Sequence, residues 1–275
     1  MRTWPIRRHV FALDHPIRFS MNIMAIVRRI QRVVKRALHR DFVAFEGVVL
    51  PPESLRFCGT AFRDNDTFLR SSEAECKRLK DEMGLSSTSS VLEIGCGPAR
   101  LPIGILKDFG PIQRYYGVDI SKGAIRWCNA HIKRKHPEYE FLHLDLKHDR
   151  YNPNGIDFTQ GFQLPLEPAS FDIIYLHSVF ANMLADDIRA YAREFARLLR
   201  PGGKIFLTAF VEDGVPDMTV NPDDYILVPQ GTLHFVRYER AYFFRMFEES
   251  GLKIDRYLQS EDLGGQSAVH LSLAD

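Results

Sequence analysis

The sequence lacks the features that define several large protein classes. Cysteine is scarce, with only Cys58, Cys76, Cys96 and Cys128 in 275 residues, and no two form a C-x-x-C pair. This spacing argues against a zinc site or a disulfide framework and predicts buried, reduced thiols. No apolar run is long enough to cross a membrane, and a net charge of +1 gives no reason to expect nucleic acid as a partner. We therefore expect a cytoplasmic globular protein without a metal centre.

One segment departs from this even charge balance. Residues 2–40 contain many arginines and a single acid, Asp14, and apolar residues recur between the arginines at helical spacing. The pattern predicts a basic amphipathic helix over residues 22–39, within an N-terminal extension over residues 1–45. Through residues 20–40 such a helix suits an anionic membrane surface or a partner, but it also suits packing on the protein's own body. The arginines interrupt any apolar stretch, so the segment does not resemble a secretory signal, although a transit peptide fits its composition.

The remaining chain alternates short apolar stretches with helical patterns. A Pro-Pro break precedes a predicted helix over residues 65–83, and together they form a cap segment over residues 46–84. Strands are predicted at 91–94, 115–119, 139–144, 171–176, 204–210, 253–258 and 267–273, and further helices at 99–109, 122–135, 186–199 and 240–250. Residues 212–240 interrupt the alternation and predict a lid or insertion. The pattern predicts an α/β domain over residues 85–275, with a mostly parallel sheet covered on both faces.

A glycine turn follows the first of these strands in the stretch VLEIGCGPAR, residues 91–100. Gly95 and Gly97 permit backbone angles that other residues avoid, and the helix that follows offers free N–H groups to a carboxylate or phosphate. A dinucleotide fingerprint needs a third glycine where this chain has Arg100, which argues against a nicotinamide cofactor. Glu93 suits a cationic ligand such as S-adenosylmethionine (SAM), which carries an ammonium and a sulfonium. The alternative is a purely structural turn.

Acidic residues end the next two strands, at the edge where open α/β sheets bind their ligands. Asp119 is predicted to accept hydrogen bonds from ribose hydroxyls, with Ile120 beside it, although it also suits a helix cap. Asp145 is predicted to accept a bond from the adenine amino group, with Leu146 against the ring.

Histidines supply the candidates for a general base. His177 follows the fourth strand, where it would face the reacting methyl group, and His234 lies in the predicted lid. A histidine that only packs against neighbouring residues, or caps the next helix, is an equally simple interpretation of His177.

Taken in order, VLEIGCGPAR, YYGVDIS, LDL, PLEPASFDIIYLHSVFANM and LLRPGGKIFLT resemble the class I SAM-dependent methyltransferases over roughly residues 65–273. The resemblance implies a Rossmann-like, doubly wound seven-stranded sheet with an antiparallel last strand, and SAM as the cofactor. It gives the methionine part of SAM to Glu93, Gly95 and Gly97, and implies that Asp119 binds ribose. It also implies that Asp145 and Leu146 hold adenine.

A narrower resemblance rests on PPESLRF, the YNPNG loop and SVFANM, which are similar to bacterial methyltransferases associated with polysaccharide or glycan biosynthesis. The chain departs from these relatives at Ala99, where they have glycine, and at Asn182, where they often have histidine. The resemblance implies methyl transfer to an oxygen or nitrogen of a small-molecule or sugar acceptor. Two alternatives remain open: a catalytically inactive scaffold at a membrane or partner surface, and, with less support, a nicotinamide-dependent oxidoreductase.

Overall fold

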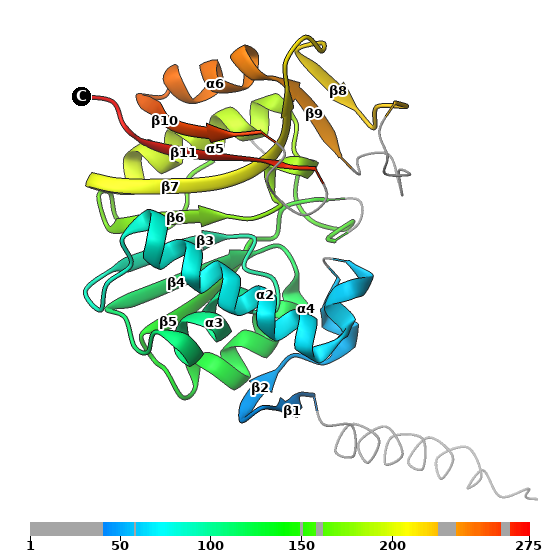
Figure 1. Ribbon diagram of the computed structural model, residues 1–275, viewed down its shortest axis with the longest axis vertical. Helices are drawn as coiled ribbons and strands as arrows, with labels where there is room; N and C mark the ends of the chain where they lie inside the picture. Colours follow the sequence, from blue (N-terminus) through cyan, green and yellow to red (C-terminus); the bar gives the residue numbers. More distant parts are fainter. Residues whose placement is uncertain (1–40, 58, 149–150, 158–161, 225–234, 260–264) are drawn as a thin grey trace, which may run out of the picture. The chain divides into compact units, whose positions relative to one another are not determined.

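A central sheet with helices on both faces organises the computed structural model, which describes residues 41–57, 59–148, 151–157, 162–224, 235–259 and 265–275 (Figure 1). Residues 42–275 form one compact unit, so the predicted cap segment belongs to the same unit as the α/β domain. The predicted helix over residues 22–39 and the candidate base His234 lie outside the described residues.

The main sheet has the strand order β10-β11-β7-β6-β3-β4-β5. Its strands are β3 (Ser90–Ile94), β4 (Arg114–Asp119), β5 (Tyr139–His143), β6 (Phe171–Leu176), β7 (Leu199–Glu212), β10 (Leu252–Leu258) and β11 (Ser267–Leu273). The pairs β5-β4, β4-β3, β3-β6 and β6-β7 are parallel, whereas β11 runs antiparallel to both β7 and β10. This arrangement confirms the predicted Rossmann-like sheet with an antiparallel last strand.

Each face of the sheet packs against its own group of helices. The helices are α2 (Asn65–Arg78), α3 (Arg100–Asp108), α4 (Lys122–Cys128), α5 (Ala185–Leu198) and α6 (Arg240–Glu248). Along β3, Leu92 and Ile94 join the hydrophobic core with α5 and α6, while Val91 joins the core with α2, α3 and α4. Side chains of a strand alternate between its two faces, so a strand buried on both faces must be apolar throughout. Glu93 is an exception, because it places an ionisable side chain in the middle of this buried strand.

Two predicted helices end in a turn that is wider than that of an α-helix. A π-helical turn at Leu79–Met83 follows α2 and stops at Gly84, whose φ of 75° is left-handed. Another, at Asn129–Lys133, follows α4. The N-cap of α2 is Asp64, which accepts a hydrogen bond of 2.8 Å from the Thr67 N–H.

Additional short elements surround this framework. The hairpin β1 (Val43–Phe45) and β2 (Val48–Leu50) lies on the N-terminal side, followed by 3₁₀ turns at Glu53–Leu55 and Thr60–Arg63, and a third 3₁₀ turn lies at Phe180–Asn182. The strands β8 (Met218–Val220) and β9 (Val236–Glu239) fall within the region predicted as a lid. They pair with each other, and β9 pairs with the end of β7, so the described part of this region extends the sheet.

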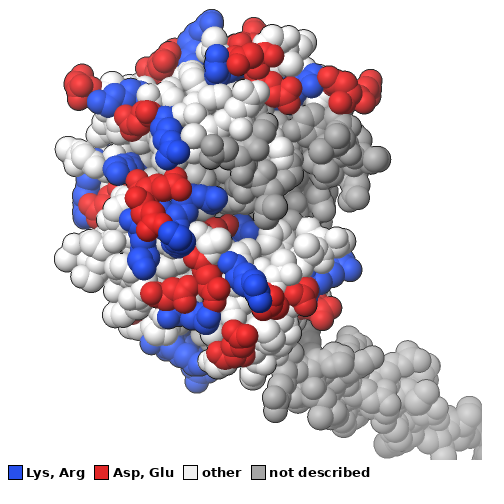
Figure 2. Space-filling view, viewed as in Figure 1, with Lys and Arg blue, Asp and Glu red and all other residues white. Residues whose placement is uncertain are grey.

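Charged side chains of both signs are interspersed on the face of the molecule shown in Figure 2. Several form ion pairs, such as Arg70 with Asp66 at 2.6 Å and Arg114 with Glu140 at 3.2 Å. Exposed pairs of this kind contribute little to stability. No helix among the described residues is both long and apolar enough to span a membrane.

Candidate functional site

A cavity of about 720 Å³ opens at the carboxyl ends of β3, β4 and β6. Parallel strands leave such a crevice where their order reverses, and here β3 has β4 on one side and β6 on the other. Its lining includes Ile94, Gly95, Gly97, Val118, Asp119, Ile120, Leu144, His177, Ser178, Val179, Ala181, Asn182, Met183, Tyr191, Phe210, Phe235 and Gln266. Arg56, Phe57, Gly59, Thr60, Arg63, His148 and Tyr151 complete it.

The glycine turn brings bare backbone to this cavity. Gly95 and Gly97 have φ angles of 76° and 49°, which are left-handed and favour glycine. The N–H groups of Gly95 and Cys96 donate to the Val118 carbonyl at 2.7 and 3.1 Å, so the turn is tied to the end of β4. A Cβ added at Gly97 would meet nothing within 4 Å, and Gly97 therefore borders open space.

Asp119 also lines the cavity, and the backbone holds its carboxylate in place. One oxygen accepts from the Gly97 N–H at 2.7 Å and the other from the Ser121 N–H at 2.6 Å. Burial raises the pKa of Asp119, and these two backbone donors oppose that rise. Each carboxylate oxygen keeps a second lone pair, so Asp119 retains acceptor capacity toward a ligand. Ile120 lies beside it, and its carbonyl accepts a 3.1 Å hydrogen bond from His143 Nε2.

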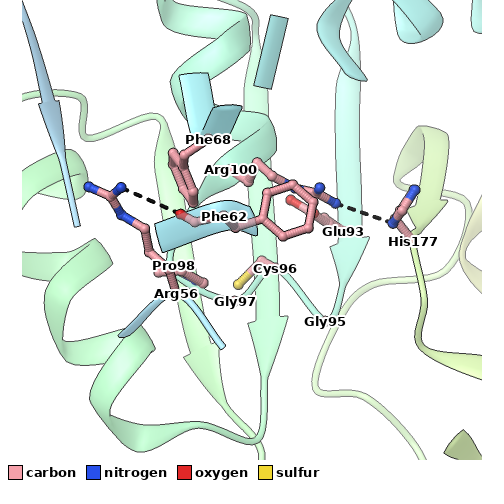
Figure 3. A pocket seen from close by; sticks show the side chains of 10 residues that line it. All are labelled: Arg56, Phe62, Phe68, Glu93, Gly95, Cys96, Gly97, Pro98, Arg100 and His177. Atoms are coloured by element: carbon pink, nitrogen blue, oxygen red, sulfur yellow. Dashed lines mark hydrogen bonds between the residues drawn. The ribbon is translucent and has the colours of Figure 1, made fainter. Parts of the chain in front are cut away.

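Glu93 has a different position from the one that the sequence suggested. It points from β3 toward α2 and α3 and lines a separate, small cavity of about 30 Å³ beside the glycine turn (Figure 3). The carboxylate is 4% exposed and accepts a hydrogen bond from the Tyr115 hydroxyl. Burial, and then the nearby Glu75, raise the pKa of Glu93 well above its usual value, although Tyr115 and Arg100 act in the opposite sense.

Arg100, the residue that argued against a dinucleotide fingerprint, lines this small cavity together with Glu93. Its guanidinium forms an ion pair with the buried Glu75 and lies over the Phe62 ring, 4.8 Å from the ring centroid. It also reaches His177, with Arg100 Nη2 3.2 Å from His177 Nδ1 (Figure 3). One guanidinium thus lies among two buried carboxylates and a histidine.

The contact with Arg100 determines which ring nitrogen of a neutral His177 carries the proton. A guanidinium only donates hydrogen bonds, so Nδ1 must accept and the imidazole carries its proton on Nε2. His177 lines both cavities, as expected for a residue that follows β6. In this form it is a hydrogen-bond donor rather than a base, which counts against the catalytic role predicted for it.

Asp145 and Leu146 are not among the residues that line the cavity. The Asp145 side chain is exposed and accepts from Asn152 Nδ2 at 3.0 Å, and Leu146 pairs with Ile156 in an isolated bridge. The neighbouring residues Leu144 and His148 reach the cavity instead. The position of the third strand was correct, but the structure gives these two adenine-binding assignments no support.

Sequence reasoning missed an aromatic wall on one side of the cavity. The Tyr151 ring lies 4.9 Å from the His148 ring and 5.6 Å from the Phe57 ring, and all three line the cavity. Tyr151 belongs to the YNPNG loop, whose function the sequence did not reveal.

Phe57 is held in that wall by the fold of its own segment. The neighbouring Arg56 is 2% exposed, and its Nε donates to the Pro51 carbonyl at 2.9 Å while Nη1 donates to the Arg63 carbonyl at 3.1 Å. Arg56 also lies over the Phe68 ring, and in Figure 3 its guanidinium is turned away from Glu93. Arg56 therefore closes residues 51–63 into a loop over the cavity.

The side of the cavity toward β7 and β9 is mainly apolar. Val179, Ala181, Met183, Phe210 and Phe235 line it. The Phe210 and Phe235 rings meet edge to face at 5.8 Å. Asn182 is also in the lining, and its Nδ2 donates to the Ser178 carbonyl at 3.3 Å.

Comparisons with known proteins identify a methyltransferase domain in this chain. Residues 92–205, which include the glycine turn and Asp119, match the family described as a methyltransferase domain. A curated relative, a demethylmenaquinone methyltransferase of Halalkalibacterium halodurans, is 24% identical over 218 residues, which cover 72% of this chain and 81% of the relative. An uncharacterized protein of Methanocaldococcus jannaschii, MJ0906, is 28% identical over 134 residues, 48% of this chain but only 32% of its own length.

Solved structures share the fold at lower sequence identity. The glycopeptide N-methyltransferase MtfA, solved with S-adenosyl-L-methionine, aligns with a TM-score of 0.50 and 11% identity over 74% of this chain and 94% of its own. At this identity the likeness concerns the fold alone.

Proposed function

Because the chain is a class I SAM-dependent methyltransferase, we propose that the large cavity holds SAM at the ends of β3 and β4 and a small-molecule acceptor toward β6 and β7. The observation that carries this proposal is the convergence of Gly95, Gly97, Asp119 and Ile120, from two strands, on one cavity. Open space at Gly97, next to a carboxylate with spare acceptor capacity, fits a ligand that carries hydroxyl groups.

The residues present fit the parts of SAM one by one. We assign the ribose hydroxyls to Asp119, the methionine part to the turn at Gly95 and Gly97, and the adenine ring to the wall of Phe57 and Tyr151. Aromatic rings offer a flat apolar surface to a base. Bound SAM supplies an electrophilic methyl group, so the chain's own contribution is alignment of the acceptor and exclusion of water.

Glu93 fits the proposal through its charge rather than through direct contact with the cavity. Two buried carboxylates, Glu75 and Glu93, lie near the guanidinium of Arg100, and an ionised Glu93 places negative charge beside the glycine turn. A cationic ligand bound at the adjacent glycine turn is favoured by that charge. We propose that Glu93 acts on SAM at this distance.

We propose an acceptor with an apolar or aromatic body rather than a sugar. Phe210, Phe235 and Met183 offer apolar surface, whereas a sugar needs hydrogen-bonding partners for its hydroxyls. The named substrate of the Halalkalibacterium halodurans relative, demethylmenaquinone, is compatible with this chemistry. An apolar acceptor would be met at a membrane surface, and we propose residues 20–40 for contact with it.

Isothermal titration of SAM into the full chain tests the cofactor site, with Asp119→Asn and Asp145→Asn as a matched pair. Both variants change an aspartate at or just after the end of a strand of the sheet, but only Asp119 lines the cavity. We expect Asp119→Asn to weaken SAM binding by about tenfold or more, because hydrogen bonds to a charged group contribute about 1.5–3 kcal/mol. Asp145→Asn should stay within about twofold of the wild type, a difference of under about 0.5 kcal/mol, because Asp145 does not line the cavity.

Two results would contradict the proposal. Wild-type protein that fails to bind SAM removes the cofactor site altogether. A larger loss in Asp145→Asn than in Asp119→Asn places the adenine at Asp145, as the sequence first suggested, outside the cavity lining.

A further inference from the structure

Three polar side chains form a closed hydrogen-bonded chain beneath the acceptor side of the cavity. Ser178 follows β6, Thr208 lies in β7, and Gln266 precedes β11. The Ser178 N–H donates to Thr208 Oγ1 at 2.8 Å, Thr208 Oγ1 donates to Gln266 Oε1 at 2.7 Å, and Gln266 Nε2 donates to Ser178 Oγ at 2.6 Å. Thr208 is fully buried and Gln266 is 8% exposed, whereas Ser178 and Gln266 line the cavity.

The buried threonine fixes the direction of this chain. Thr208 Oγ1 already accepts the Ser178 N–H, and its own proton needs an acceptor, which Gln266 Oε1 provides. The opposite orientation of the amide would give Thr208 a second donor and leave its buried proton without an acceptor, at a cost in stability. The amide nitrogen of Gln266 therefore faces Ser178, and Ser178 Oγ accepts.

Ser178 is consequently a donor toward the cavity. Its Oγ receives the bond from Gln266, and among the described residues its own proton has no hydrogen-bond acceptor. The residue is held at a φ of 59°, a left-handed conformation that a serine adopts only under constraint. Unusual backbone of this kind is often found at functional sites, and here it keeps the hydroxyl at the cavity wall.

We propose that Ser178, held as a donor by Thr208 and Gln266, binds an anionic oxygen of the methyl acceptor, such as a phenolate or enolate. The assignment rests on the proposed function, because it requires SAM at the neighbouring glycine turn. The neighbouring His177 lines the same cavity and is held by Arg100. Ser178 donates its proton and takes none from a neutral hydroxyl, so the acceptor binds with its own proton already lost to solvent.

The transfer step balances without a protein base. An electron pair of the acceptor anion forms a bond to the methyl carbon, the bond from that carbon to sulfur breaks, and sulfur keeps its electron pair. The anion loses its negative charge and SAM its positive charge. The hydroxyl of Ser178 holds the acceptor by its oxygen, and the apolar residues Phe210 and Met183 lie beside its body.

Ionisation of 4-nitrophenol, a phenol whose anion absorbs visible light, tests the proposal in the full chain saturated with S-adenosylhomocysteine. We expect binding to lower the pKa of the probe by about one unit or more, as hydrogen bonds to charged groups predict. Ser178→Gly removes the hydroxyl at a φ that glycine adopts freely, and should abolish the shift.

Variants of the two positioning residues separate polarity from packing. Thr208→Val should lose the shift and Thr208→Ser should keep it, because only the latter retains the hydroxyl. Gln266→Glu replaces the donor to Ser178 by an acceptor of the same shape, so the serine proton turns inward and the shift should disappear. A purely structural role would leave the ionisation of the probe unchanged in folded variants.

The outcomes distinguish this inference from the proposed function. Titration of S-adenosylhomocysteine into the same protein shows whether the cofactor site exists, and wild type that does not bind it refutes the proposed function and, with it, this assignment. Wild type that binds S-adenosylhomocysteine but does not lower the pKa of the probe overturns the Ser178 assignment alone. A normal shift in Ser178→Gly or in Gln266→Glu also overturns it.

Discussion

Alanine substitutions at Gly95 and Gly97 distinguish two functions of the glycine turn, which are close packing against Val179 and space for a ligand. Both glycines have positive φ, so each alanine incurs a left-handed backbone cost of about 1–2 kcal/mol. Their surroundings differ. A Cβ at Gly95 would lie 2.4 Å from Val179 Cγ2, whereas a Cβ at Gly97 meets nothing within 4 Å.

These differences give two distinct expected profiles. Gly95→Ala adds an overpacking cost of about 1–3 kcal/mol to the backbone cost, and so should lower the free energy of unfolding by about 2–5 kcal/mol. Gly97→Ala should lower it by only about 1–2 kcal/mol. Its methyl group enters the space that we assign to SAM, so Gly97→Ala should weaken SAM binding by about tenfold to a hundredfold.

Urea denaturation and isothermal titration of SAM measure these two quantities on the same proteins. Removing the clashing methyl group in Gly95→Ala/Val179→Ala should recover part of the stability, with a coupling energy of about 0.5–3 kcal/mol. Equal stability of the two single variants, or a coupling energy of zero, would refute the packing argument. Unchanged SAM affinity in a folded Gly97→Ala protein would show that the open space beside Gly97 is not the binding site.

Further predictions concern the packing of helices, pH and the N-terminal segment. Gly104→Ala places a Cβ 2.0 Å from the Ser72 carbonyl oxygen of α2 and should destabilise the fold by about 1–3 kcal/mol or more in urea, whereas Gly123→Ala, whose nearest contact is Leu55 at 3.4 Å, should be neutral or slightly stabilising. The raised pKa of Glu93 means that the native state keeps a proton which the unfolded state releases, so stability should fall as pH rises from the usual glutamate pKa of 4.5 toward the folded value. Glu93→Gln should flatten that decline in urea midpoints measured across pH, and an unchanged slope would contradict the assignment. Replacing Arg28, Arg29 and Arg32 by glutamate should abolish sedimentation of the full chain with anionic liposomes, and neutral liposomes are the control.

The parts of the site that could be predicted from the sequence are marked by residues close together in the chain. A short apolar strand followed by glycines predicts a βα turn, and Asp119 at the end of the next strand reaches the same edge through the parallel topology. The same reasoning failed for Glu93, because its position in β3 places its side chain on the other face of the strand from the large cavity. Side chains alternate between faces, and in β3 Glu93 shares the face of Val91, away from that of Ile94, which lines the large cavity.

Contacts between distant segments account for what the sequence did not reveal. After β5 ends, strand geometry no longer sets the direction of a side chain, and Asn152 draws Asp145 to the surface. The aromatic wall joins Phe57 to Tyr151, and the hydrogen-bonded chain joins Ser178 to Gln266, residues that the fold alone brings together. Their sequences contain no periodicity or spacing that marks such pairs.

Arg100 lines the small cavity and explains why the fold tolerates Glu93 in a buried strand. A buried carboxylate without a cation is costly, and Glu75 and Glu93 both lie near the guanidinium of Arg100. Burial and the nearby Glu75 raise the pKa of Glu93, so that a proton on Glu93 removes its negative charge when no cationic ligand is bound. A cationic ligand at the glycine turn offers the same compensation, so protonation of Glu93 and binding of SAM compete for one negative charge. It follows that SAM should bind more tightly as Glu93 ionises, that binding should release a proton, and that both effects should vanish in Glu93→Gln.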